Sequence, residues 1–491
     1  MKGKLGLVLF ILSLCMLSNC NSNIDTQKNV PNIIMITLDT VRADHLGCYG
    51  YERDITKNID LIAEDSVQFE GAISVIPLTG PSHVSIMTGL HPLTHQIYSN
   101  GSKVDEELNM VAEILKKNGY KTGAFVSSSL MRGEKGFGQG FDVYSNVARS
   151  KKGFRANPKA NMRSADKTVD AAVKWLGGVD QEQFFLWLHF YDAHTPYLPP
   201  DEIGLKLNPE YLNYKKEVKQ QFIKRFAKKR GLVKNRKNMP GVPAEALDEE
   251  PHVSAPKKPI ALNSKQPRNS RRKFPHMTKR IGSPDNESLK TRKKKRQGRF
   301  EAKIDAYDGE IAFIDHQLAR IFNFLKNKGL YENSIIIIMS DHGEMLGEKK
   351  NYFGHHLFLY RGALNIPLLM KFPGVTPRDI RTRLTNLDVF PTLLDALQIE
   401  YNDKMDGISY WPLIKSGQEV NPHEYDILVT HVDFRRRSAR KKSKSIKGKD
   451  QSRTENETDT GFSLNEAFNR KGIIKDNWKM VEVYNRRDNA T

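Results

Sequence analysis

A threonine lies in this sequence where a nucleophile could act. Residues 77–83 read Pro-Leu-Thr-Gly-Pro-Ser-His and lead into a predicted helix. Because Pro81 suits the first turn of a helix, Thr79 is expected just before the helix N-terminus, where free N–H groups favour an anion. A hydroxyl is a weak nucleophile until a base or a metal ion removes its proton. The alternative is that Thr79 is a turn residue whose side chain bonds its own backbone. Metal ligands near Thr79 would favour the nucleophile.

Possible metal ligands follow two apolar runs. Asp39 comes after Ile-Ile-Met-Ile, and Asp341 and His342 come shortly after Ile-Ile-Ile-Ile-Met. Such runs are typical of parallel strands buried on both faces, and the C-terminal ends of these strands meet at one edge of the sheet. Asp39, Asp341 and His342, together with Thr79, are therefore predicted to bind one divalent metal ion. Carboxylate and imidazole ligands suit Ca²⁺, Mg²⁺, Mn²⁺ or Zn²⁺ without selecting one of them. Taken alone, Asp39 could equally cap the segment that follows it.

The elements that would position these residues belong to an α/β fold. A third buried strand is predicted at Phe184 to Phe190, ahead of Asp192 and His194. Apolar residues recur at intervals of three and four from Ile304 to Leu325, which predicts a helix that covers the sheet and ends at Gly329. We expect a mostly parallel sheet covered by helices on both faces, followed by a small C-terminal region.

Together the motifs resemble the sulfatase family of the alkaline-phosphatase superfamily over most of residues 30–415. The resemblance rests on six stretches: 38–50, from Leu-Asp-Thr to Leu-Gly-Cys-Tyr-Gly; 77–83; 189–196, His-Phe-Tyr-Asp-Ala-His-Thr-Pro; 340–344, Ser-Asp-His-Gly-Glu; 354–356, Gly-His-His; and 387–394, Leu-Asp-Val-Phe-Pro-Thr-Leu-Leu. It implies a metal-dependent hydrolase or transferase that acts on sulfuric or phosphoric esters.

The resemblance also implies roles for several histidines. It makes His194 a substrate contact that orients the ester or protonates the leaving oxygen, with a core or surface histidine as the alternative. It gives a similar role to His355 or His356, which the sequence does not separate. His83 stands beside the nucleophile as a further catalytic candidate. Cys48 belongs to a structural part of the first motif and is expected to be a small packed residue.

Two residues depart from the family pattern. Sulfatases of the main type convert a Cys or Ser at the position of Thr79 to formylglycine, and the extra methyl group of Thr79 prevents this. A Thr there resembles the phosphotransferase and phosphodiesterase branches, in which the hydroxyl attacks phosphorus to form phosphothreonine. A phosphate ester or diester is therefore favoured. His83 replaces an Arg, which removes a permanent charge and a bidentate donor. These departures leave one alternative, a catalytically inactive protein that binds an anionic ligand.

The N-terminus predicts export and a lipid anchor. Two lysines precede an apolar run that is too short to span a bilayer and matches a secretory signal peptide. Residues 17–20, Leu-Ser-Asn-Cys, resemble a bacterial lipobox. This makes 1–20 the lipoprotein signal segment, with Cys20 at its end as the lipidated first residue of the mature chain. An ordinary signal peptide is the alternative. Residues 21–29 would tether the enzyme to the membrane, at the periplasmic face or the cell surface. Of the chain's three cysteines, Cys15 leaves with the signal, Cys20 takes lipid and Cys48 has no partner, so no disulfide is expected.

The formal net charge of +20 is confined to one segment. Residues 214–300 hold 27 Lys and Arg against 7 Asp and Glu, and the rest of the chain is neutral. Specific nucleic-acid binding by the body is therefore not expected. Residues 201–300 are predicted to be a largely flexible insertion, either a solvated loop or a contact for anionic lipid or glycan. A second basic stretch, 435–453, is predicted to be a loop within a small C-terminal region, 416–491.

Overall fold

The computed structural model describes residues 30–147, 158–159, 161–229, 286–349, 351–355, 359–417, 427–431, 470–475 and 478–483. Five features predicted from the sequence lie outside the described residues: the signal peptide with Cys20, the tether, the middle of the basic insertion at 230–285, His356 and the basic loop at 435–453. Among the described residues, no helix combines the length and the apolar composition needed to cross a membrane.

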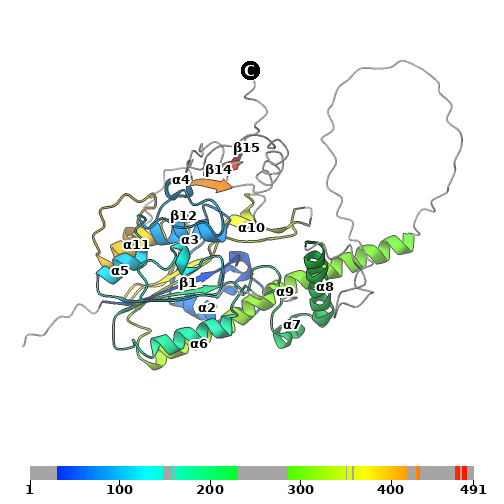
Figure 1. The fold of residues 1–491 in the computed structure, drawn as a ribbon, viewed down its shortest axis with the longest axis horizontal. Coiled ribbons are helices and arrows are strands. Elements are labelled where there is room, and N and C mark those ends of the chain that lie inside the picture. The colour runs from blue at the N-terminus through cyan, green and yellow to red at the C-terminus, as the bar shows by residue number, and fades with distance from the viewer. Residues whose placement is uncertain are drawn as a thin grey trace, which may run out of the picture.

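An eight-stranded sheet forms the centre of the molecule (Figure 1). Its strands, in order across the sheet, are β11 (Arg378–Ile380), β2 (Val67–Phe69), β10 (Leu368–Lys371), β7 (Ser334–Met339), β1 (Asn32–Leu38), β6 (Phe184–Phe190), β4 (Lys121–Val126) and β5 (Val143–Ser145). β1 pairs in parallel with both β6 and β7, whereas β10 is antiparallel to β7 and β2. The mostly parallel α/β sheet predicted from the apolar runs is confirmed.

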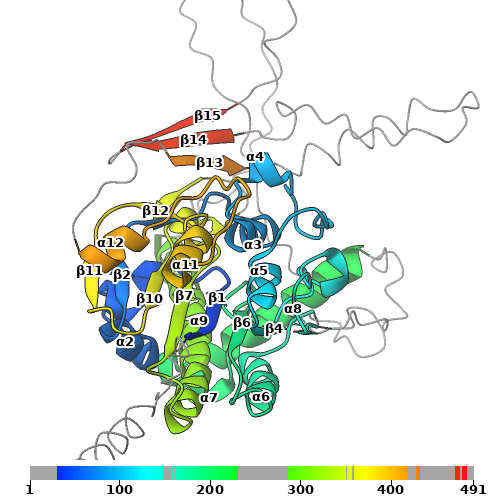
Figure 2. The same cartoon turned by 90° about the vertical axis from the view of Figure 1, so that its left-hand side faces the viewer.

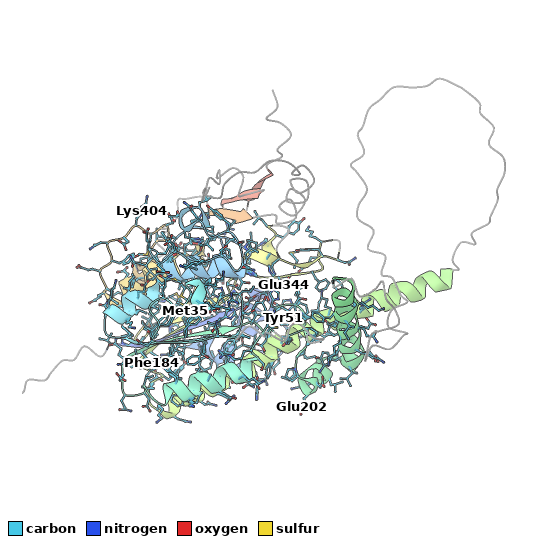
Figure 3. The ribbon with its side chains drawn as sticks, in the orientation of Figure 1. Met35, Tyr51, Phe184, Glu202, Glu344 and Lys404 are labelled. Atoms are coloured by element: carbon cyan, nitrogen blue, oxygen red, sulfur yellow. The ribbon has the colours of Figure 1, made fainter. Side chains whose placement is uncertain are left out.

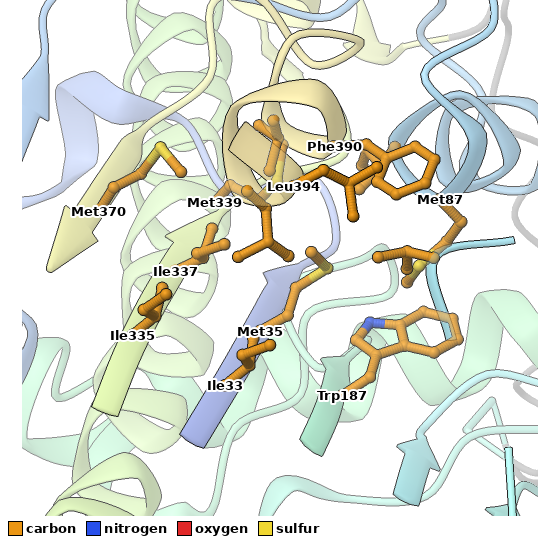
Figure 4. Close-up of a cluster of buried hydrophobic side chains, with 14 of the residues drawn as sticks. Ile33, Met35, Met87, Trp187, Ile335, Ile337, Met339, Met370, Phe390 and Leu394 are labelled. Atoms are coloured by element: carbon orange, nitrogen blue, oxygen red, sulfur yellow. The ribbon is translucent and has the colours of Figure 1, made fainter. Parts of the chain in front are cut away.

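Helices cover both faces of this sheet. One face carries α3 (Thr79–Thr88), α5 (Val111–Lys117), α11 (Val389–Leu397) and α12 (Trp411–Ser416), and the other carries α2 (Lys57–Glu64), α6 (Ala165–Leu176) and α9 (Asn286–Asn327). Side chains of β1 alternate between the two layers, with Met35 in the first core cluster and Ile36 in the second. Figure 4 shows the first cluster, where β1 and β7 meet Phe390 and Leu394 of α11. The two cores hold the central strands rigidly.

Helix α9 contains the apolar stripe predicted from the sequence. Tyr307, Ile311, Ile314, Leu318, Ile321 and Leu325 are all buried in the second cluster. The helix ends at Asn327, and Gly329 follows with a positive φ of 66°. This is the left-handed conformation that glycine adopts most readily at a helix C-terminus. At its other end α9 begins at Asn286, well before the predicted stripe.

The prediction of a largely flexible segment over 201–300 is wrong at both of its ends. Helices α7 (Asp201–Leu207) and α8 (Tyr211–Lys229) follow β6, and the first part of α9 occupies 286–300. Tyr211 and Tyr214 of α8 are buried in the second cluster, and the Tyr211 hydroxyl donates to the Pro199 carbonyl over 2.6 Å. These two tyrosines hold α8 in place, although the helix is mostly polar and has no apolar stripe that continues over several turns.

Smaller elements surround the sheet. They are α4 (Pro92–His95), α10 (Arg361–Leu364), three 3-10 turns (Ala43–His45, Gly47–Tyr49, Gly133–Lys135), the strand pair β3 (Ala72–Ile73) with β12 (Leu384–Thr385), and the pair β8 (Met345–Leu346) with β9 (Phe353–Gly354). The C-terminal region forms a separate antiparallel sheet of β13 (Ile427–His431), β14 (Arg470–Lys475) and β15 (Trp478–Val483), seen at the top of Figure 2.

Candidate active site

Three predicted metal ligands meet at the C-terminal edge of the sheet. Asp39 follows β1, and Asp341 and His342 follow β7, its neighbour. One side-chain ligand atom from each of the three residues lies within 4.8 Å of the others, and all three residues are buried. In Figure 3, Glu344 beyond β7 and Phe184 at the start of β6 lie toward opposite ends of the strands. The parallel pairing of β1 and β7 thus produces the predicted cluster.

The cluster holds several polar atoms without hydrogen-bond partners. Among the described residues, both Asp39 carboxylate oxygens, Asp341 Oδ2, His342 Nε2 and Thr79 Oγ1 are buried and make no hydrogen bond. Such atoms are rare in folded proteins because each costs about 1–3 kcal/mol. Carboxylate, hydroxyl and imidazole atoms are all ligands of divalent cations. The residues present therefore fit one divalent metal ion.

Electrostatics at the cluster also favour a cation. Burial raises the pKa of Asp39 to about 7, although the charge of His342 partly opposes this rise. Burial and then the charge of Asp39 raise the pKa of Asp341 to about 6. Burial lowers the pKa of His342, but the two carboxylates outweigh it and the net shift is upward. In the absence of a metal ion, protons would occupy this site.

Without a bound ion, the protein is expected to lose stability as the pH rises from about 4 to about 7. The pKa of Asp39 in the folded protein, about 7, exceeds its model value of 3.8. The folded state therefore binds more protons in this range, and the free energy of unfolding falls as they leave. A divalent ion takes the place of the proton and should remove this contribution. Thermal unfolding in EDTA between about pH 5 and about pH 8 measures the slope.

The matched control for this experiment is Asp39→Asn. Other buried carboxylates with a raised pKa, such as Asp192 and Glu310, contribute equally to both proteins. The dependence of stability on pH should therefore be shallower in the variant. Equal slopes in the two proteins would show that Asp39 does not titrate as described.

Thr79 is the first residue of α3, whereas the sequence predicted that it would lie just before the helix. The prediction that the helix N-terminus offers free N–H groups to an anion is wrong for the three residues that follow Thr79. The Gly80 N–H donates to Asn100 Oδ1 over 2.7 Å, Pro81 has no N–H, and the Ser82 N–H donates to the Leu78 carbonyl. The protein itself satisfies these donors, so an anionic substrate must be held mainly by other groups.

His83 occupies the next turn of α3, and both of its ring nitrogens are used inside the protein. Nδ1 is 2.8 Å from the Thr79 carbonyl, and Nε2 is 3.1 Å from Thr37 Oγ1. The residue is fully buried, and burial lowers its pKa to about 3. The predicted catalytic role for His83 is therefore corrected, because neither nitrogen is available to a leaving group.

The histidines predicted to contact substrate lie on the outer side of the cluster. His194 stacks on Tyr191 with ring centroids 4.3 Å apart and lies 5.3 Å from His355. The His355 ring is in turn 4.3 Å from that of His342, and its Nδ1 is 3.3 Å from Glu344 Oε1. The structure thus brings His194 and His355 together beside His342, a candidate metal ligand.

His189 is a site residue that sequence reasoning missed. It is the sixth residue of β6, in register with Thr37 of β1, and its Nε2 lies 3.5 Å from Asp39 Oδ2. Both ring nitrogens lack hydrogen-bond partners among the described residues, and burial lowers the pKa to about 3. A histidine inside an otherwise apolar buried strand was the available signal, because such a position normally excludes polar side chains.

Comparisons with known proteins identify sulfatases as relatives of this chain. A family model for sulfatases matches residues 31–399, and a model for the C-terminal region of N-sulphoglucosamine sulphohydrolase matches 347–452. An arylsulfatase of Clostridium perfringens is 26% identical over 407 residues, covering 78% of each chain. An N-acetylglucosamine-6-O-sulfatase of Bacteroides thetaiotaomicron is 23% identical, covering 85% of this chain and 76% of the relative.

Solved structures share the fold at lower sequence identity. A phosphonate monoester hydrolase of Agrobacterium radiobacter superposes with a TM-score of 0.61 at 19% identity, covering 92% of this chain and 87% of the other. A protein solved in complex with its substrate D-glucosamine-2-N,6-O-disulfate superposes with a TM-score of 0.63 at 18% identity, covering 93% and 89%.

Proposed function

The chain belongs to the sulfatase family of the alkaline-phosphatase superfamily, and we propose that it is a metal-dependent ester hydrolase in which the Thr79 hydroxyl is the nucleophile. Members of this family hydrolyse sulfate esters and use a divalent metal ion. The observation that carries the proposal is the group of buried, unpaired ligand atoms from Asp39, Asp341 and His342 beside the unpaired Thr79 hydroxyl.

The chain's own residues divide the reaction between them. A divalent ion bound by Asp39, Asp341, His342 and Thr79 would supply Lewis acidity that favours loss of the hydroxyl proton to water. Thr79 Oγ1 forms a bond to the phosphorus or sulfur atom while the bond to the leaving oxygen breaks. His355, whose Nδ1 lies 3.3 Å from Glu344 Oε1, donates a proton to that oxygen. Burial lowers the pKa of His194 to about 3, so His194 orients the ester as a neutral imidazole. Water then cleaves the covalent intermediate and restores the hydroxyl.

The proposed substrate is a phosphate ester, with a phosphodiester included, in preference to a sulfate ester. Support comes from the residue type, because Thr79 cannot be converted to formylglycine and must attack as a hydroxyl. Water is the proposed acceptor of the phosphoryl or sulfuryl group, and an alcohol in its place would give a transfer reaction.

The experiment that tests this function compares metal-reconstituted protein on an aryl sulfate, an aryl phosphate and an aryl phosphodiester. We expect the phosphate substrates to be cleaved faster. Efficient cleavage of aryl sulfate alone would overturn the phosphate preference. Ion binding without turnover of any of the three would favour the inactive binding protein instead.

We also propose that the enzyme is exported and held at a membrane by lipid on Cys20, and that the basic segment between 214 and 300 is either solvated or in contact with anionic lipid or glycan. The Cys20→Ser protein should leave the membrane fraction, because acyl chains supply most of the apolar area available for insertion. Fractionation followed by immunoblotting measures this. Unchanged partition would contradict the anchor, whereas residual binding that weakens with salt would reveal the basic contact.

A further inference from the structure

A chain of three buried side chains runs from the sheet to the nucleophile's residue. The Trp187 indole of β6 donates to Thr37 Oγ1 of β1 over 3.0 Å. Thr37 Oγ1 is 3.1 Å from His83 Nε2, and His83 Nδ1 is 2.8 Å from the Thr79 carbonyl. Thr37 and His83 are fully buried, as is the Trp187 ring.

The chemistry of the end groups sets the direction of the first and last of these hydrogen bonds. A carbonyl only accepts, so His83 Nδ1 must carry a proton and donate it to Thr79. An indole N–H only donates, so Thr37 Oγ1 accepts from Trp187 and is free to donate its own proton to His83 Nε2. The three contacts are satisfied together when His83 is the neutral tautomer protonated at Nδ1.

This chain connects the two halves of the proposed site. Thr37 lies near the end of β1, two residues before Asp39, and His83 lies one helical turn after Thr79. A second contact ties the same turn to the segment that follows β7, since Ser82 Oγ donates to the Asp341 carbonyl over 2.7 Å. The first turn of α3 is therefore tied to both segments that supply carboxylate ligands.

We propose that Trp187, Thr37 and His83 are positioning residues that fix Thr79 against Asp39 for in-line attack. The inference rests on the proposed role of Thr79 as the nucleophile. His83 does not supply a charge to the substrate; its hydrogen bond sets where the first residue of α3 lies. A displacement of about 1 Å between reacting groups can cost about 100-fold in rate, so such a device would act on kcat.

The test uses Thr37→Val, which keeps the side-chain shape and removes the hydroxyl. We expect kcat to fall by about 10-fold to about 100-fold, with KM and the affinity for Mn²⁺ within about twofold of the starting protein. His83→Leu should lose at least as much. His83→Asn should recover much of the loss, because its amide nitrogen can donate to the Thr79 carbonyl from near the place of Nδ1.

The matched control lies on the same helix. Ser85 Oγ is 3.1 Å from His95 Nε2, another hydroxyl paired with a buried imidazole. Ser85→Ala removes a comparable buried hydrogen bond and should leave kcat unchanged. If Ser85→Ala lowers kcat as much as Thr37→Val, the effect is general destabilisation and the positioning role is refuted.

A spectroscopic measurement detects the protonation of His83 in these hydrogen bonds without any turnover. In protein labelled with ¹⁵N-histidine, the His83 signals, identified by their absence in His83→Asn, should show a proton on Nδ1 and none on Nε2. The opposite tautomer would overturn the inference. So would normal kcat in both Thr37→Val and His83→Leu when Thr79→Ala is inactive. If Thr79→Ala keeps full turnover, the proposed function itself fails and the inference falls with it.

Discussion

Replacing Asp341 with Asn is expected to abolish both ion binding and turnover. The substitution keeps the shape of the side chain but removes the negative charge that faces Asp39 and His342 across the cluster. Residues that only orient metal ligands typically contribute 10-fold to 100-fold in metal affinity, so loss of a ligand should weaken binding by at least about 100-fold. Isothermal titration with Mn²⁺ or Ca²⁺ and steady-state kinetics measure the two effects.

Asp315→Asn is the matched control for this variant. Asp315 is also a buried carboxylate whose pKa is raised to about 6, chiefly by burial, but it accepts hydrogen bonds from the backbone of Asn58 and Ile59 instead of joining the cluster. The control should bind the ion normally even if its stability falls. Equal loss of ion affinity in both variants would refute Asp341 as a ligand.

Replacing Thr79 with Ala is expected to lower kcat by on the order of 10⁴-fold or more, since removal of a nucleophile elsewhere has cost about 10⁶-fold. The ion should still bind through the three remaining ligands, with reduced affinity. Thr79→Ser keeps a hydroxyl and should retain measurable turnover. The control is Thr88→Ala at the other end of α3, where a buried threonine bonds the Val84 carbonyl. Full turnover in Thr79→Ala would point to water as the nucleophile.

The cluster of Asp39, Asp341 and His342 was predictable because it follows from strand topology. Long apolar runs identify buried parallel strands, and polar residues directly after such strands converge at one edge. Asp39 and Asp341 are more than 300 residues apart in the sequence, yet β1 and β7 are neighbours. The same argument placed His194 near this edge. Local sequence was sufficient to predict an element wherever apolar residues form a continuous run or recur with the period of a helix.

Other features depend on contacts that local sequence does not contain. Nothing around Gly80 indicates that Asn100 would take its N–H, so the helix N-terminus looked open to an anion. His83 was predicted to be catalytic because its partner Thr37 lies on a strand 46 residues away. Helix α8 was missed because two tyrosines, and not a full apolar stripe, anchor it. Each error reflects a side chain whose partner is distant in sequence.

Mass spectrometry of the Thr79 peptide tests the central claim most directly. Metal-loaded enzyme would be mixed with an activated phosphodiester, quenched rapidly in acid and digested. We predict a phosphoryl adduct on Thr79 that forms at least as fast as turnover and is absent from Thr79→Ala. Turnover of the same substrate with no adduct on this peptide at any quench time would contradict attack by Thr79.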